Sequence, residues 1–238
     1  VSPDGAFISA ARIQELRDRF LADQPFAPVM TIDRSLYDLA STVFASQRVM
    51  LREHFRCVPA IIAYSNTAFY GEQIQPLRIP KASERLDPPL VDILVRGGVR
   101  DGRDTNVLEA DAIASEIEAI VRNPDMAGRS IGVVSLLGLE QAKHIDTQVR
   151  TRVDAKELLE RDFYCGDASM FQGGERDIMF LSMVVSPGTS TARSGTSAEQ
   201  RFNVAASRAR DRMYLVRSVT LEDLSDKDLR QGLLKHFS

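Results

Sequence analysis

Two glycines and a carboxylate stand directly before the most apolar stretch of this chain. Gly173-Gly174 is followed by Glu175 and then by residues 178–185, which contain a single polar side chain. Glycine allows the backbone to turn tightly or to approach a ligand closely. The apolar run predicts a strand buried on both faces, as in a parallel sheet between helices. α/β proteins often bind ligands beside such strands, so we expect a site here, with Ser169 and Gln172 in the same loop.

A second stretch, residues 199–216, places arginines beside small residues. The spacing of its apolar residues predicts a helix with Phe202 and Ala209 on one face, followed by a strand at 213–216. On such a helix Arg201 and Arg208, seven positions apart, would point the same way. A guanidinium held beside a glycine loop suits a phosphate group, which arginine grips with several donors. The alternative from composition alone is a solvated, arginine-rich helix face.

These two stretches, in this order and at this separation, resemble the fifth and sixth motifs of superfamily one nucleic-acid helicases. The branch that contains the nonsense-mediated-decay helicase and its bacterial relatives is the most similar. Residues 51–61, which read Leu-Arg-Glu-His-Phe-Arg-Cys-Val-Pro-Ala-Ile, resemble the fourth motif, and Val1-Ser2-Pro3 resembles the tail of the third. Three ordered motifs over most of the chain make the resemblance specific.

The resemblance implies roles for residues around ATP, which the family binds between two RecA-like domains. Arg56 and Arg208 match the catalytic arginines that neutralise charge developing on the γ-phosphate. Glu175 matches an acid near the ribose and phosphates, and Gln172 and Gly173 belong to the same nucleotide-binding motif. Each has a structural alternative: Arg56 as an ion-pair partner, Glu175 as a surface acid, and Gln172 as a cap of its own loop.

The resemblance also implies a nucleic-acid partner. Ser135 and Ser169 match hydroxyl positions that contact a single-stranded DNA or RNA backbone, although both could be turn hydroxyls. The implied direction of movement is 5′ to 3′. Gln141 and Asn203 are candidates only for a supporting hydrogen-bond network, and His54 has no partner that suggests a catalytic triad.

The sequence contains no Gly-x-x-x-x-Gly-Lys-Ser/Thr motif to cradle phosphates. It also lacks an acidic pair after an apolar strand that would hold magnesium. The resemblance therefore implies the C-terminal half of a motor, inactive alone. ATP with Mg would be held mainly by the N-terminal RecA-like domain of the same protein, which is the expected partner.

Composition is that of an ordinary globular protein, with 238 residues, 44% hydrophobic and 26% charged. A net charge of −3 gives no global attraction to nucleic acid, so such contact needs a local patch. Two cysteines, outside any metal-ligand pattern, predict neither a disulfide framework nor a metal site. We expect a cytoplasmic protein without a membrane span.

The remaining pattern alternates strands with helices. Strands are expected at 49–51, 91–95 and 131–136, and helices at 59–69, 106–121 and 138–149. This alternation predicts an α/β, RecA-like fold: a mostly parallel sheet with helices on both faces. We expect residues 1–46 to be a helical connector after the third motif, with helices at 10–21 and 35–43, and residues 47–238 to be the second RecA-like domain.

Two other functions remain open at this point. One is a non-catalytic RecA-like module that binds nucleic acid or protein. The other is a stand-alone phosphate- or nucleotide-binding α/β enzyme with Glu175 or His54 as base. The enzyme predicts a closed pocket within one chain, whereas the motor half predicts its arginines on an open edge.

Overall fold

The computed structural model describes residues 9–31, 34–102, 104–188 and 192–238. The chain forms two compact units, Val1–Leu51 and Arg52–Ser238. The third-motif resemblance at residues 1–3 lies outside the described residues. Within the described residues, none of the helices has the length and hydrophobicity needed to span a bilayer.

The first unit is made of short helices with little buried surface. α1 (Ala10–Phe20) and α2 (Leu36–Val43) contain no buried residue. α2 begins with a capping box: Ser35 Oγ accepts from Asp38 N at 3.2 Å, and Asp38 Oδ2 accepts from Ser35 N at 2.8 Å. Short 3-10 turns, Ala27–Val29 and Ala45–Gln47, follow the two helices.

The strand predicted at 49–51 is wrong. Val49 and Leu51 are 84% and 85% exposed and carry no strand assignment. A short apolar run forms a strand only where another strand can pair with it. The nearest strand instead is β1 (Glu53–His54), which pairs in parallel with β2 (Gln75–Pro76).

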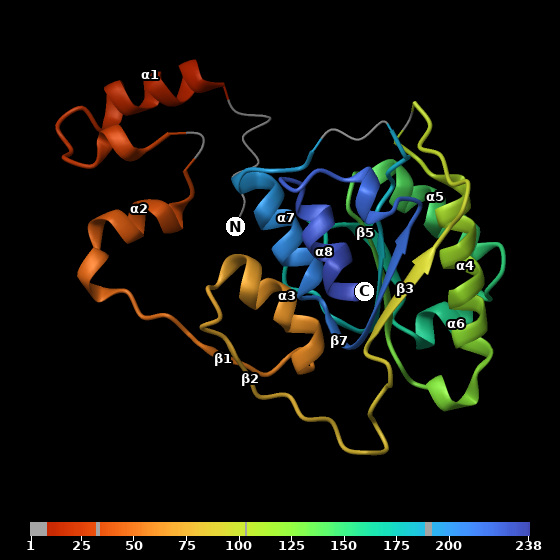
Figure 1. Cartoon of the computed structure of the whole chain (residues 1–238). Coiled ribbons are helices and arrows are strands. Elements are labelled where there is room, and N and C mark those ends of the chain that lie inside the picture. Colours follow the sequence, from red (N-terminus) through yellow and green to blue (C-terminus); the bar gives the residue numbers. More distant parts are fainter. Residues whose placement is uncertain (1–8, 32–33, 103, 189–191) are drawn as a thin grey trace. The chain divides into compact units, whose positions relative to one another are not determined.

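The second unit is built on a parallel sheet of five strands (Figure 1). Their spatial order is β3-β7-β6-β4-β5, and every neighbouring pair is parallel. The strands are β3 (Leu90–Leu94), β4 (Ile131–Ser135), β5 (Tyr164–Asp167), β6 (Arg176–Ser182) and β7 (Ala209–Arg217). This confirms the predicted fold class.

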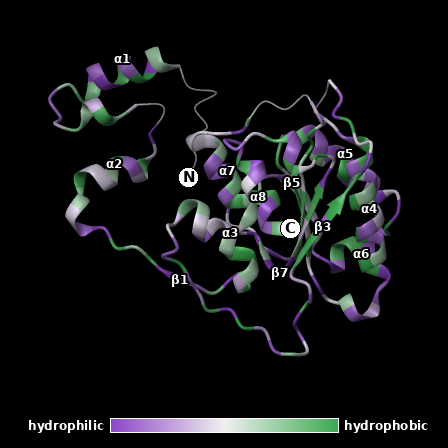
Figure 2. Ribbon diagram, viewed as in Figure 1, coloured by the Kyte–Doolittle hydropathy of each residue, from purple (hydrophilic) through white to green (hydrophobic). Residues whose placement is uncertain are grey.

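Helices cover both faces of this sheet. One core joins the sheet to α3 (Pro59–Phe69), α7 (Thr196–Ala206) and α8 (Leu229–Phe237). The other joins it to α4 (Val107–Arg122), α5 (Leu139–Arg150) and α6 (Ala155–Glu160). Figure 2 shows the strands as largely hydrophobic and α4 and α7 as mixed. Successive residues of β6 enter opposite cores, because side chains alternate along a strand.

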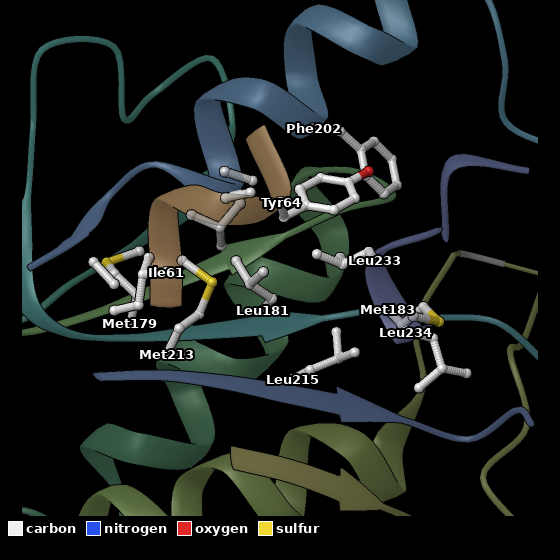
Figure 3. Packing of buried hydrophobic residues seen from close by; sticks show 14 of the residues in the cluster. Ile61, Tyr64, Met179, Leu181, Met183, Phe202, Met213, Leu215, Leu233 and Leu234 are labelled. Atoms are coloured by element: carbon white, nitrogen blue, oxygen red, sulfur yellow. The ribbon is translucent and has the colours of Figure 1, made fainter. Parts of the chain in front are cut away.

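The packing of the first core is seen from close by in Figure 3. Ile61 and Tyr64 of α3 and Phe202 of α7 share this core with Leu181 of β6 and Met213 of β7, and Phe202 lies beside Tyr64. Pro59 is the first residue of α3, where its missing N–H costs nothing. The helix therefore begins three residues after Arg56, which fixes that arginine at its amino end.

The junction between α7 and β7 differs from the prediction. α7 ends at Ala206 and β7 begins at Ala209, so Ala209 is not helical and Asp211 lies inside the strand. Asp211 is 1% exposed, and two arginines distant in sequence pair with it. Arg208 occupies the short connection, so the seven-residue helical spacing from Arg201 does not apply.

Candidate functional site

The three segments that resemble the fourth, fifth and sixth helicase motifs meet where β6 and β7 begin. Arg176 N donates to Arg208 O at 3.0 Å, which aligns the start of β6 with the residue before β7. Val58 N donates to Arg210 O at 2.9 Å, which ties the segment before α3 to the same edge. Glu175 directly precedes Arg176. The amino edge of the sheet therefore brings together Arg56, Glu175 and Arg208, although they come from three distant parts of the chain.

Arg56 and Glu175 form an ion pair in this cluster. Arg56 Nε lies 2.5 Å from Glu175 Oε2, and the two side chains are 30% and 40% exposed. Arg56 Nη1 also donates to Ser207 O at 3.3 Å. A second arginine approaches the same carboxylate, with Arg210 Nε 3.8 Å from Glu175 Oε1. Glu175 is therefore a shared counter-ion and not an isolated surface acid.

Arg208 is held mainly by carbonyl groups. Its Nε donates to Val204 O at 3.0 Å, and its Nη1 donates to Gly174 O at 3.2 Å and to Phe171 O at 3.5 Å. Its Nη2 donates to Ser207 Oγ at 3.2 Å. Burial, and then the charge of Arg56, lower the pKa of Arg208. An arginine nevertheless remains a cation in a protein.

The two arginines therefore differ in what they can offer an anion. A guanidinium has five N–H groups. Arg56 uses two of them and Arg208 uses four, counting partners among the described residues. Arg56 can bind an anion as it stands, whereas Arg208 must exchange carbonyl partners to do so. The expectation of arginines on an open edge did not anticipate that Arg208 would be held by carbonyl groups.

His54 lies in the same cluster. Its Nε2 accepts from Cys57 N at 3.0 Å, so that nitrogen carries no proton in this geometry. Burial, followed by the charges of Arg56 and Arg208, lowers the pKa of His54. A neutral imidazole whose free lone pair is already bound is a structural group. This arrangement gives no support to His54 as a catalytic base.

Gln172 and Gly173 are exposed in the turn that leads to Glu175. Gly173 has a φ of +85°, a conformation that favours glycine. The Gln172 backbone N–H donates to Ser169 O at 3.3 Å, while its side chain has no hydrogen bond among the described residues. Its amide is consequently available to a ligand.

The two serines lie at the opposite, carboxyl edge of the sheet. Ser135 ends β4, is 1% exposed, and its Oγ accepts from Gly138 N at 3.2 Å. Ser169 follows β5, is exposed, and donates to Asp167 Oδ1 at 2.6 Å. Seven residues of strand span roughly 20 Å. Ser135 is thus separated from Arg56, Glu175 and Arg208 by about the length of β6, whereas Ser169 lies within one turn of Gln172.

One charged group of the cluster escaped sequence reasoning. Arg210 contacts Glu175 and lies 3.5 Å from Asp177. The sequence pattern predicts that the last strand starts at residue 213. With the correct start at Ala209, the position of Arg210 two residues after Arg208 would have indicated the amino edge of the sheet. Phe55 is 64% exposed beside Arg56. No group of His, Cys, Asp and Glu in the described part of the chain could hold a metal ion.

A parallel sheet covered by helices on both faces defines this protein as a RecA-like α/β domain. The chain belongs to the AAA domain family, whose sequence profile matches residues 32–220. It is also similar to the 5'-3' DNA helicase ZGRF1 of Mus musculus, with 27% identity over 200 residues. That match covers 79% of this chain and 10% of the relative, so the chain spans about a tenth of that protein.

Proposed function

We propose that this chain is the second motor half of an ATP-dependent DNA or RNA helicase or translocase of superfamily one, of the type related to the nonsense-mediated-decay helicase. The observation that carries this is the cluster at the amino edge, where Arg56, Glu175 and Arg208 share hydrogen bonds through Ser207 and the 171–175 turn. The similarity to a DNA helicase supports the same function.

In this function the cluster faces ATP and Mg held mainly by the first RecA-like domain of the same protein. Arg56 contacts phosphate through N–H groups that have no partner among the described residues, and Glu175, Gln172 and Gly173 line the nucleotide. Arg208 exchanges its carbonyl partners for the γ-phosphate as charge develops there. These contacts exist only when the two domains close, so nucleotide binding favours closure.

Single-stranded nucleic acid is held at the other edge of the sheet, near Ser135 and Ser169. Because the two edges lie a strand length apart, the domain can hold nucleotide and nucleic acid at the same time. Closure and opening of the ATP cleft then change how tightly the domain binds the single-stranded nucleic acid. Contacts with phosphates make this grip largely indifferent to sequence.

The test measures ATP hydrolysis. The chain alone should show no turnover, because it lacks a P-loop and magnesium-binding acids. Turnover that Arg208→Ala abolishes in the isolated chain would refute the proposal. In the longer protein, Arg208→Ala should lower kcat by roughly 10³- to 10⁵-fold with little change in ATP affinity. The exposed Arg122→Ala on α4 is the control.

One observation favours a non-catalytic RecA-like module that binds nucleic acid or protein. Arg208 has four donors bound within the chain, as a structural arginine would. In that case Arg208→Ala lowers the melting temperature and leaves the ATPase activity of the longer protein unchanged. Measuring both quantities on the same variant separates the two functions.

A further inference from the structure

Two adjoining pockets open at the carboxyl edge of the sheet. The larger, about 230 Å³, is lined by residues that include Leu136, Arg193, Ser194, Ser197 and Arg201. The smaller is lined by residues that include Ser135, Asp167, Ser169 and Arg201. Because Leu136 and Arg201 line both, we call the two pockets together the carboxyl-edge groove. It joins the predicted nucleic-acid serines to two arginines without an assigned role.

The arginines of this groove have no counter-ion within the described part of the chain. Neither Arg193 nor Arg201 has a side-chain hydrogen bond or ion pair with any residue that the structure describes. Two neighbouring arginines are paired: Arg100 with Asp104, and Arg230 with Asp228. Burial, and then the charges of Arg230, Arg100 and Arg201, lower the pKa of Arg193, while Asp104 opposes this only weakly.

Among the described residues that line the groove, the single carboxylate is already hydrogen-bonded. Asp167 Oδ1 accepts from Ser169 N at 3.0 Å, from Ser169 Oγ at 2.6 Å and from Met170 N at 3.2 Å. It therefore stabilises its own turn and does not neutralise either arginine. Like charges gathered in a concave site raise the local positive potential and attract an anion. A local positive site of this kind is what a chain of net charge −3 needs in order to hold a polyanion.

We propose that the carboxyl-edge groove binds phosphodiester groups of single-stranded nucleic acid, with Arg193 and Arg201 as the phosphate ligands and Ser194 and Ser197 as hydroxyl donors. This rests on the proposed function. The proposal assigns the electrostatic binding of the phosphates to the two arginines, because Ser135 is almost fully buried and Ser169 is hydrogen-bonded to Asp167. Guanidinium forks match phosphate oxygens and read no base.

The experiment measures binding of labelled dT12 and rU12 to the 238-residue chain by fluorescence anisotropy across a salt series. Arg201→Ala and Arg193→Ala should each weaken binding at low salt by roughly tenfold to hundredfold. Each should also lower the slope of log affinity against log salt by about 0.7, the value for one phosphate of a single strand. Arg201→Lys and Arg193→Lys should retain the slope, because they retain the charge.

Controls separate this site from other causes. Arg122→Ala, on an exposed part of α4, should leave affinity and slope unchanged. The groove variants should keep the wild-type melting temperature; if an alanine variant does not, Arg201→Gln and Arg193→Gln replace it. Inorganic phosphate at constant ionic strength should not displace dT12. Displacement at low millimolar phosphate would indicate a free-anion site and would overturn the assignment.

The outcomes also separate this inference from the function on which it rests. If the wild-type chain binds neither oligonucleotide, both the groove assignment and the nucleic-acid part of the proposed function fail. If the wild-type chain binds but the groove variants keep its affinity and salt slope, the groove assignment alone is wrong. In that case the oligonucleotide binds elsewhere on the domain.

Discussion

The buried carboxylate of Glu109 should make the stability of this protein depend on pH. Glu109 lies on α4, is 0% exposed, and reaches the carboxyl ends of two strands. Its Oε2 accepts from Ser182 Oγ and from Val184 N, each at 2.9 Å. Its Oε1 accepts from Ser218 Oγ at 2.9 Å and from Asn106 Nδ2 at 3.2 Å. Burial outweighs these hydrogen bonds and raises the pKa of Glu109 to about 7.

The sign and size of the effect follow from proton linkage. Between the ordinary pKa of 4.5 and the folded pKa of about 7, the folded state binds a proton that the unfolded state has lost. The free energy of unfolding therefore falls as pH rises through this range. A difference of about 2.5 pH units at about 1.36 kcal/mol each corresponds to about 3 kcal/mol. The stabilisation is complete below pH 4.5 and is lost above pH 7.

The perturbation is Glu109→Gln, which keeps the shape and removes the titration. Urea denaturation of both proteins from pH 4.5 to 8 gives the free energy of unfolding at each pH. The difference between wild type and variant should fall by about 3 kcal/mol across this range. Glu140→Gln, at an exposed position on α5, should show no such trend. Parallel profiles for wild type and Glu109→Gln would refute the reasoning.

Three further results are expected. Asp211→Ala should lower the free energy of unfolding by about 3 kcal/mol in urea denaturation, because it leaves two largely buried guanidinium groups unpaired; a loss below 1 kcal/mol would contradict this. Gly98→Ala should lower it by about 1–3 kcal/mol, because a Cβ there would lie 2.1 Å from Ser218 Oγ, and Ser218→Gly should restore part of the loss. Glu175→Gln should weaken ATP binding by the longer protein if the acid positions Arg56, as measured by nucleotide titration; unchanged affinity would leave Glu175 only a counter-ion.

Local patterns were sufficient for most of the fold. The apolar run at 178–185 predicts β6, and the periodic residues after Asn106 predict α4. Asn106 caps that helix by accepting from Glu109 N at 3.2 Å, and Pro59 opens α3 as predicted. These features depend on residues that are neighbours in the sequence, so they can be predicted from the sequence. The alternation of strands and helices then leaves few topologies besides a parallel sheet.

Tertiary contacts decided the remaining boundaries. Asp211 precedes the strand predicted at 213–216 but lies inside β7, because Arg78 and Arg129 neutralise it from distant segments. β5 and α8 escaped prediction, since neither has a local pattern strong enough to stand apart from its surroundings. Val49 and Leu51 have the composition of a strand but no partner strand.

The same distinction holds for the site. Sequence alone indicated which residues to propose for the chemistry, because glycines, arginines and an acid at fixed spacing are local features. Only the tertiary structure decided that Arg56 and Arg208 meet at the amino edge while Ser135 and Ser169 lie at the carboxyl edge. It also decided that Glu175 is shared and that Arg208 is bound to carbonyls. The physical reason is that the availability of a charged group depends on the neighbours that folding brings to it from elsewhere in the chain.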